Sequence, residues 1–262
     1  MMGEEEPVMS GSDPTEGAGV LVIIPAYNEA GRVGKVIEEV QTALPKADVL
    51  VVDDGSKDET GREAYEAGAY TVWLPTNAGY GAALQTGYKF AVRQGYPFVA
   101  QIDGDGQHRA EYLVPMLETL IGEKADLVIG SRFLAADGHY KPSLARTVGI
   151  GLFSRIATLA CGQPISDPTS GFQVMREPVA RFFCSSVYPT DYPDADVLIL
   201  LHRTGFKVRE VAVQMRPSPG DSMHTTKTTP YYVYKMLLSI GVTMLRPKVQ
   251  PPFEAAELKL EI

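Results

Sequence analysis

The segment Val99–His108, VAQIDGDGQH, holds the residues best suited to chemistry. Its apolar run ends in Asp103, Gly104 and Asp105. Residues two apart in a strand point to the same face, so both carboxylates converge at the end of a predicted strand, where parallel sheets bind ligands. Paired carboxylates suit Mg²⁺ or Mn²⁺ shared with substrate phosphates, and Gln107 could add a third oxygen. Alone, these residues also fit a polar turn.

Two further polar clusters follow other apolar runs. Residues 25–29, PAYNE, follow the first run, and residues 53–56, DDGS, follow the second. The carboxyl ends of parallel strands meet at one edge of a sheet, so all three clusters are expected to lie together. Carboxylates brought together repel, and a cation or the donor groups of a ligand would relieve that repulsion. An aspartate at a strand end can also accept from ribose hydroxyls or a base N–H. The clusters predict a site for a nucleotide held with a metal.

The hydrophobic pattern predicts the elements that position these clusters. Short apolar runs predict strands at 20–25, 49–52, 70–74, 98–102 and 126–129, with helices between them at 33–44, 58–67, 82–93 and 110–120. Later segments predict a loop at 133–142, helices at 144–160 and 194–204, and strands at 172–175 and 206–213. Alternating strands and helices indicate a mainly parallel sheet covered on both faces.

Composition excludes several classes of protein. The chain has 262 residues and a net charge of -8, which disfavours nucleic acid as a partner. Cys161 and Cys184 form no C-x-x-C pair, so we expect buried thiols in a reducing compartment rather than a zinc site. The chain has no G-x-x-x-x-G-K-[ST] phosphate loop and no G-x-S-x-G nucleophile motif.

The two ends of the chain differ from the rest. Residues 1–19 are rich in Gly, Glu, Ser and Pro, lack an apolar signal region, and are expected to be a disordered leader. The stretch 231–245 is too short to span a membrane and carries Lys235. It fits a helix that lies on a membrane or a partner, or one packed on the core. We therefore divide the chain into the leader, a domain at 20–228, a C-terminal helix at 229–248 and a tail at 249–262.

Six segments between residues 20 and 213 carry a family resemblance. They are VIIPAYNE, VLVVDDGSKDET, NAGYGAALQTGYKFA, VAQIDGDGQH, DLVIGSRF and DPTSGFQVM. In this order they resemble the family 2 glycosyltransferases with a GT-A fold, and most of all the dolichol-phosphate mannose synthase and polyprenyl-phosphate glycosyltransferase branch. The resemblance implies an α/β, Rossmann-like, mixed and mainly parallel sheet with helices on both faces. It also implies metal-dependent, inverting sugar transfer from a nucleoside-diphosphate sugar to a dolichyl or undecaprenyl phosphate, in cell-envelope glycan synthesis.

The resemblance also implies roles for the donor residues. The nucleotide pocket would be lined by Pro25, Tyr27, Asn28 and Glu29, with Asp53 at the base or ribose and Asp54 beside it. Asp103 and Asp105 match the D-x-D pair that holds the metal and the diphosphate, and Gln107 matches a further metal ligand. Arg132 matches an arginine near the phosphates.

On the acceptor side the match is looser. Ser170 and Gly171 match an acceptor-side S-G-F. The family's R-x-x-G-x-S-K is replaced by a longer segment, RPSPGDSMH, that begins at Arg216. Asp194 and Asp196 replace an acidic pair and could act as general base toward a hydroxyl acceptor, whereas an ionised phosphate needs no strong base. Acids at a helix N-terminus are also favoured by the helix dipole. Arg132 and Arg216 could donate hydrogen bonds to the diphosphate.

A lipid acceptor implies a membrane nearby. Cations in the last third of the chain favour an anionic surface or the acceptor phosphate, although scattered surface residues would look the same; they are Arg209, Arg216, Lys227, Lys235, Arg246 and Lys248. We expect a cytoplasmic protein with peripheral contact at the cytoplasmic face of a membrane, or with a small membrane protein. Two alternatives remain, transfer to a saccharide hydroxyl and a non-catalytic subunit that binds sugar nucleotides. A nucleotidyltransferase is less well supported, because PAYNEAGR is not a basic glycine-rich loop.

Overall fold

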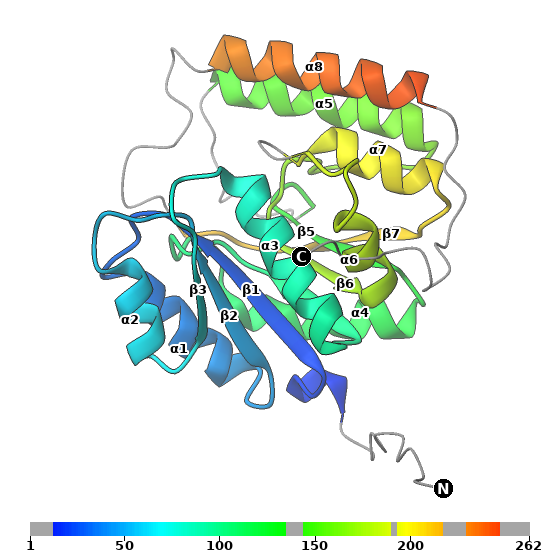
Figure 1. Cartoon of the computed structure of the whole chain (residues 1–262). Helices are drawn as coiled ribbons and strands as arrows, with labels where there is room; N and C mark the ends of the chain where they lie inside the picture. Colours follow the sequence, from blue (N-terminus) through cyan, green and yellow to red (C-terminus); the bar gives the residue numbers. More distant parts are fainter. Residues whose placement is uncertain (1–12, 135–143, 190–192, 217–228, 247–262) are drawn as a thin grey trace, which may run out of the picture.

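One mixed sheet forms the centre of the molecule (Figure 1). The computed structural model describes residues 13–134, 144–189, 193–216 and 229–246, and these contain seven strands in the order β3-β2-β1-β4-β6-β5-β7. The strands are β1 Val20–Ala26, β2 Asp48–Asp53, β3 Tyr70–Trp73, β4 Phe98–Gln101, β5 Leu127–Ser131, β6 Gln173–Arg176 and β7 Val208–Ala212. Only the pairs that β6 makes are antiparallel. The expected mixed, mainly parallel α/β sheet is therefore confirmed.

Strand β1 is apolar along its whole length because both of its faces are buried. Leu21 and Ile23 belong to one core cluster, and Val22 and Ile24 belong to the other. The first cluster lies under α3 Tyr80–Gln94 and α6 Glu177–Phe183, and the second lies under α1 Val33–Ala43, α2 Thr60–Glu66 and α4 Leu113–Gly122, which follows the short 3-10 helix η2 Ala110–Tyr112. The two helical layers shield the sheet and leave its edges for function.

The reversed strand β6 brings a distant segment to the end of β4. In the antiparallel β4–β6 pair, Gln101 lies opposite Gln173. The residues just before β6 therefore lie beside the residues just after β4. This register places Ser170 and Gly171 at the carboxyl edge of the sheet.

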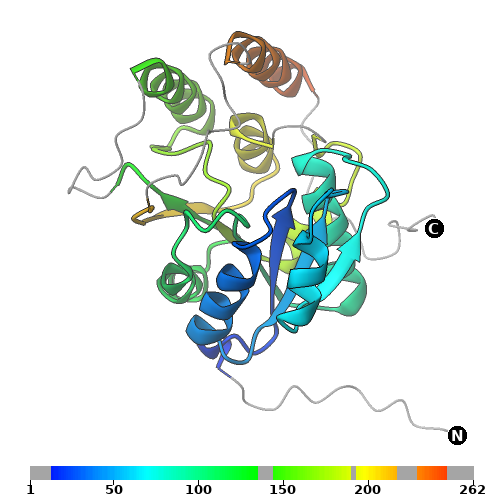
Figure 2. The same cartoon turned by 90° about the vertical axis from the view of Figure 1, so that its left-hand side faces the viewer.

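Three helices form an outer layer. Helices α5 Leu144–Cys161 and α8 Thr229–Leu245 both pack against α7 Ala195–Arg203 and run along the outside of the molecule (Figures 1 and 2). Met236 and Ile240 of α8 belong to the same core cluster as Leu21 and Ile23 of β1. The C-terminal helix therefore packs on the domain. Among the described residues, none of the helices is both long and apolar enough to cross a bilayer.

The start of the described chain is ordered. Residues 14–16 form the 3-10 helix η1 Pro14–Glu16, capped by Asp13, whose carboxylate accepts the Thr15 N–H at 2.9 Å. The Lys46 N–H donates to the Glu16 carbonyl oxygen at 3.0 Å and ties this turn to the segment before β2. The expectation of a disordered leader is therefore wrong for residues 13–19. Residues 1–12 and the tail after 246 lie outside the described residues.

Candidate functional site

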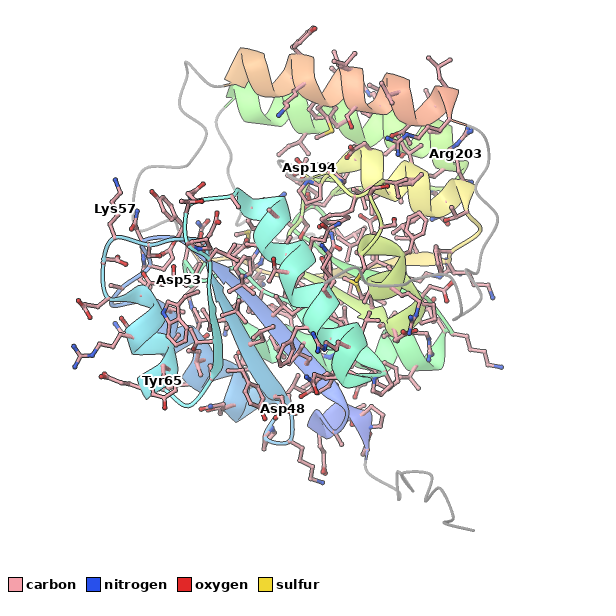
Figure 3. All side chains as sticks on the ribbon, viewed as in Figure 1. Asp48, Asp53, Lys57, Tyr65, Asp194 and Arg203 are labelled. Carbon is pink, nitrogen blue, oxygen red and sulfur yellow. The ribbon has the colours of Figure 1, made fainter. Side chains whose placement is uncertain are left out.

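The carboxyl ends of β1, β2 and β4 lie side by side. Ala26 pairs with Asp53, and Ile23 pairs with Gln101, so the segments after these strands share one edge. Figure 3 shows Asp53 at this end of β2 and Asp48 at the opposite end. The three predicted polar clusters therefore come together, as expected from a parallel arrangement.

Asp103 is held on both carboxylate oxygens. The Tyr80 hydroxyl donates to Oδ1 at 2.9 Å, and Nε2 of the buried His108 lies 3.4 Å from Oδ2. His108 in turn stacks on Phe172, with 4.9 Å between ring centroids. Burial raises the pKa of Asp103, but its contacts with His108 and Tyr80 and the charge of Arg132 outweigh burial and leave the pKa below its usual value. Asp103 therefore stays ionised in a fixed orientation.

Asp105 is held by Gln107. The backbone N–H of Gln107 donates to Oδ1 of Asp105 at 2.9 Å, and its side-chain amide donates to Oδ2. Burial and then the charge of Asp103 raise the pKa of Asp105. The intervening Gly104 faces the end of β1, because a Cβ there would lie 3.4 Å from the Pro25 carbonyl oxygen.

The charges of Asp105 and Asp103 also affect the pKa of a third carboxylate, Glu29. Burial raises its pKa to about 7, opposed by Arg32 and reinforced by Asp105 and Asp103. Arg32 Nη2 lies 2.6 Å from Glu29 Oε2. The described residues hold no cluster of three or more His, Cys, Asp or Glu side chains arranged to bind a metal. Two carboxylates suffice where substrate phosphates complete the coordination of Mg²⁺ or Mn²⁺, so the D-x-D pair fits such a cation.

Hydrogen bonds join the first two polar clusters, residues 25–29 and residues 53–56, to each other. Asn28 adopts a positive φ of 55°, its N–H donates to Ser56 Oγ at 2.9 Å, and its side-chain oxygen accepts the Lys57 N–H at 2.9 Å. Pro25 pairs with Val52 at the end of the strands, and Tyr27 is 41% exposed beside them. The PAYNE and DDGS segments therefore form one wall of the site.

The two aspartates of DDGS have different structural roles. Asp53 Oδ1 accepts the Ser56 N–H at 2.9 Å. The carboxylate of Asp54 accepts the backbone N–H groups of Ala78 and Gly79 at 2.7 and 2.9 Å. Asp54 was predicted to lie beside Asp53 in the nucleotide pocket, but its described contacts anchor the loop before α3. That loop ends at Tyr80, so Asp54 helps to position Asp103.

Arg132 forms an ion pair with Asp167, a residue that the sequence motifs did not single out. Its Nε and Nη2 donate to the two oxygens of Asp167 at 2.6 Å each, and Nη2 also donates to Thr169 at 2.8 Å. The Arg132 side chain is 5% exposed and that of Asp167 is 0% exposed. Glu210 accepts the Ser166 and Asp167 N–H groups from the other side. Arg132 therefore fixes the segment before β6, and its charge also lowers the pKa of Asp103. The pair stands in GSRF and DPTSGF, but nothing in either motif shows that they touch.

Ser170 and Gly171 reach the site in different ways. The buried Ser170 hydroxyl donates to the Gly130 carbonyl oxygen at 2.7 Å and ties this segment to β5. Gly171 lies beside Asp103, because a Cβ there would lie 2.5 Å from the Tyr80 hydroxyl and 3.3 Å from Asp103 Oδ1. Only glycine fits between Tyr80 and Asp103, so the predicted acceptor-side S-G-F is part of the wall that holds Asp103.

The two candidate bases have different surroundings. Asp194 precedes α7 (Figure 3), and its charge contributes to raising the pKa of Tyr80. Asp196 is 4% exposed, accepts the Val197 N–H at 2.9 Å, and accepts the Ser239 hydroxyl of α8. Burial raises the pKa of Asp196. The Asp196 side chain joins α7 to α8, and its role as a base stays a prediction.

Arg216 lies against the D-x-D loop. Its N–H donates to the Gln107 carbonyl oxygen at 2.8 Å, and its Nη1 lies 3.2 Å from the Gly106 carbonyl oxygen and 3.0 Å from Glu39. This segment had a looser match, and the structure brings its first residue to the loop that carries the D-x-D pair. The rest of RPSPGDSMH, with Lys227 and Lys248, lies outside the described residues.

Sequence and structure comparisons agree with this geometry. A family model described as "Glycosyl transferase family 2" matches residues 21–183. Undecaprenyl-phosphate mannosyltransferase of Micrococcus luteus is 32% identical over 62% of this chain and 68% of its own. Polyprenol monophosphomannose synthase of Mycolicibacterium smegmatis is 32% identical over 74% of this chain and 76% of its own.

Solved structures show the same fold. Mannosyl-3-phosphoglycerate synthase from Rubrobacter xylanophilus superposes with a TM-score of 0.66 at 18% identity, covering 88% of this chain and 78% of its own. Glucosyl-3-phosphoglycerate synthase from Mycobacterium tuberculosis, in complex with Mn²⁺, UDP and phosphoglyceric acid, superposes with a TM-score of 0.63 at 19% identity, covering 88% and 80%. At this identity the likeness carries the fold alone. The family model spans more than half of the chain, and this protein therefore belongs to glycosyl transferase family 2.

Proposed function

We propose that this glycosyltransferase moves a sugar from a nucleoside-diphosphate sugar to a polyprenyl phosphate, with inversion at the anomeric carbon. The observation that carries the proposal is the D-x-D pair, held from three sides at the carboxyl edge of the sheet by Tyr80, His108 and Gln107. The printed names of the two curated relatives supply the class of acceptor. Direct displacement by an ionised phosphate would give inversion without a strong general base.

The donor diphosphate would bind where Asp103 and Asp105 converge. These carboxylates, with Gln107, would hold a divalent cation, which neutralises charge on the leaving diphosphate. A cation there offsets the repulsion that raises the pKa of Asp105. The Arg216 side chain is 42% exposed, and its guanidinium, at the Gly106 carbonyl oxygen, would donate to the phosphates from the same side. Arg132 would act through the Asp167 segment and by its charge.

We expect Asp53 to recognise the nucleotide rather than take part in chemistry. It sits at the end of β2, on the wall formed by the PAYNE and DDGS segments. Asp53→Ala should therefore raise the KM for the donor more than it lowers kcat. Steady-state kinetics with the preferred donor, found by a thermal-shift panel of UDP-, GDP- and dTDP-sugars with Mn²⁺, measures this. Asp53→Asn keeps an acceptor for the Ser56 N–H and serves as the control for local structure. A large fall in kcat with an unchanged KM would contradict the assignment.

The acceptor decides between the proposal and its nearest alternative. With a phosphate acceptor, Asp194→Asn should leave transfer to a short polyprenyl phosphate within about tenfold of wild type, because no strong base is needed. Transfer of radiolabelled sugar to that lipid, followed by extraction, measures the activity. Efficient transfer to a soluble saccharide with no labelled lipid, lost in Asp194→Asn, would replace the proposal by transfer to a hydroxyl. If no acceptor releases free nucleoside diphosphate, the protein is a binding subunit.

A further inference from the structure

A buried glutamine ends the apolar strand β4. The strand reads FVAQ, and Gln101 is 3% exposed. It stands two residues after Val99, so both side chains face the first core cluster, on the side of the sheet that α3 covers. A buried amide is unfavourable unless its oxygen and its nitrogen both find hydrogen-bond partners. None of the roles assigned above uses Gln101, so its partners are the guide to what it does.

Gln101 joins α3 to the segment before β6. The Tyr88 hydroxyl donates to Gln101 Oε1, and Gln101 Nε2 donates to the Gly171 carbonyl oxygen at 2.7 Å. A carbonyl oxygen can only accept a hydrogen bond, so the amide nitrogen has to face Gly171 and the amide oxygen has to face Tyr88. The two bonds therefore hold the amide in one orientation.

Tyr88 is itself fixed by the core around it. Its side chain is fully buried, and its ring centroid lies 5.3 Å from that of Phe183 and 5.6 Å from that of Tyr188. Burial raises the pKa of Tyr88, so its hydroxyl keeps the proton that it donates to Gln101. The hydroxyl is therefore a rigid support for the amide.

Gly171 extends this support to the D-x-D pair. A Cβ on Gly171 would lie 2.5 Å from the Tyr80 hydroxyl and 3.3 Å from Asp103 Oδ1, so the backbone here has little room to move without displacing one of them. Tyr80 and Tyr88 are eight residues apart and lie on the same stripe of α3, which runs across the face of the sheet (Figure 1). One helix thus holds Asp103 directly and holds the neighbouring Gly171 through Gln101.

We infer that Gln101 is a positioning residue of the donor site: it fixes the Gly171 backbone and, through it, the orientation in which Asp103 meets a divalent cation. This inference rests on the proposed function, because that function places the cation at the D-x-D pair. Gln101 acts through Gly171 and takes no part in chemistry. Loss of a group that orients a metal-binding side chain weakens metal affinity or activity by about tenfold to a hundredfold.

Gln101→Met tests the inference, because methionine has a similar length and shape but no amide. The full chain is titrated with Mn²⁺ in the presence of UDP or GDP, whichever wild type binds more tightly, and free Mn²⁺ is measured by electron paramagnetic resonance. The variant should bind Mn²⁺ about tenfold more weakly. In the transfer assay the half-saturating Mn²⁺ concentration should rise by a similar factor, and excess Mn²⁺ should restore most of kcat. A purely structural role would lower the melting temperature and leave the Mn²⁺ dependence unchanged.

Two other variants complete the design. Gln85→Met is the matched control, because Gln85 of α3 also donates to backbone carbonyl oxygens, those of Phe183 and Ser185 at 3.0 Å each. It should bind Mn²⁺ like wild type. Tyr88→Phe removes only the hydroxyl that orients the amide, so it should weaken Mn²⁺ binding by a smaller factor. Adding Tyr88→Phe to Gln101→Met should weaken binding no further, because both changes act through one contact.

The outcomes separate this inference from the proposed function. Equal Mn²⁺ binding by wild type and Gln101→Met, with equal half-saturating Mn²⁺, overturns the inference and leaves the proposed function standing. Effects of Tyr88→Phe and Gln101→Met that multiply in the double variant also overturn it, because the two side chains then act independently. Wild type that binds no Mn²⁺ with either nucleotide overturns the proposed metal site and the inference with it. If Gln101→Met does not fold, Tyr88→Phe decides by the same titration.

Discussion

Asp105→Ala should reduce sugar transfer by about a hundredfold to a thousandfold or more while leaving the fold intact, since it removes one of the two charges that we propose to hold the metal and the diphosphate. Thermal stability should be unchanged or higher, because burial and the charge of Asp103 raise the pKa of Asp105 in the folded protein. Removing a carboxylate that folding disfavours in its charged form takes no stability away. Transfer rate, binding of nucleoside diphosphate with Mn²⁺, and melting temperature together measure the effect.

The control for this prediction lies at the other end of the sheet. Asp48 begins β2, opposite the end that carries Asp53 (Figure 3), and accepts the Tyr96 hydroxyl at 2.7 Å. Asp48→Ala should leave transfer unchanged, although it also removes an aspartate that accepts a hydrogen bond. Turnover that survives in EDTA, or in Asp105→Ala, would contradict a metal at the D-x-D pair.

Asp167→Ala should be the most destabilising of the changes considered. It would leave the guanidinium of Arg132, 5% exposed, without its carboxylate, and would remove the acceptor of the Arg132 N–H at 3.0 Å. Breaking one side of a buried ion pair costs about 3–5 kcal/mol. Urea unfolding followed by circular dichroism measures the change in the free energy of unfolding.

Two comparisons of variants distinguish the two roles considered for Arg132, which are positioning the Asp167 segment and binding the diphosphate. If Arg132 chiefly positions the Asp167 segment, Arg132→Met combined with Asp167→Leu should cost less stability than Asp167→Ala alone. If Arg132 instead binds the diphosphate, Arg132→Lys should lower transfer strongly while the free energy of unfolding stays near wild type. That second result would restore the role that the motif suggested and refute the positioning role.

Local patterns in the sequence were sufficient for most of the elements, although not for α6, and for the edge where the site lies. Strand β1 was predicted at 20–25 and spans Val20–Ala26, and the helix predicted at 33–44 spans Val33–Ala43. Apolar residues recur with the period of the strand or helix that they form. Such segments can therefore be recognised without knowing which elements pack against them. The parallel arrangement then brings Asn28, Ser56 and Asp103 to one edge, because chain direction alone decides which end of each strand they occupy.

Contacts between distant residues were decided only by the tertiary structure. The antiparallel direction of β6 sets Gly171 against Asp103 and Tyr80, and no short pattern encodes strand direction. Tyr80 stands in the NAGYG segment that opens α3, but its hydroxyl becomes a partner of Asp103 only once β2 and β4 flank β1. Sequence motifs mark which residues are present, whereas contacts such as these depend on the global register.

Burial decided which contacts Asp54, Asp196 and the stretch 231–245 make. Asp54 and Asp196 are acids beside functional motifs, yet each is 4% exposed; Asp54 accepts backbone N–H groups, and Asp196 also accepts a hydroxyl from α8. The stretch 231–245 was read either as a membrane-facing helix or as one packed on the core, and in the structure it buries Met236 and exposes Leu237 and Leu238. The residue type of an apolar side chain does not show on which side of a helix it is buried. Whether it meets the core or the solvent depends on which neighbour the fold supplies, and here α7 covers one side of α8 and leaves the other open.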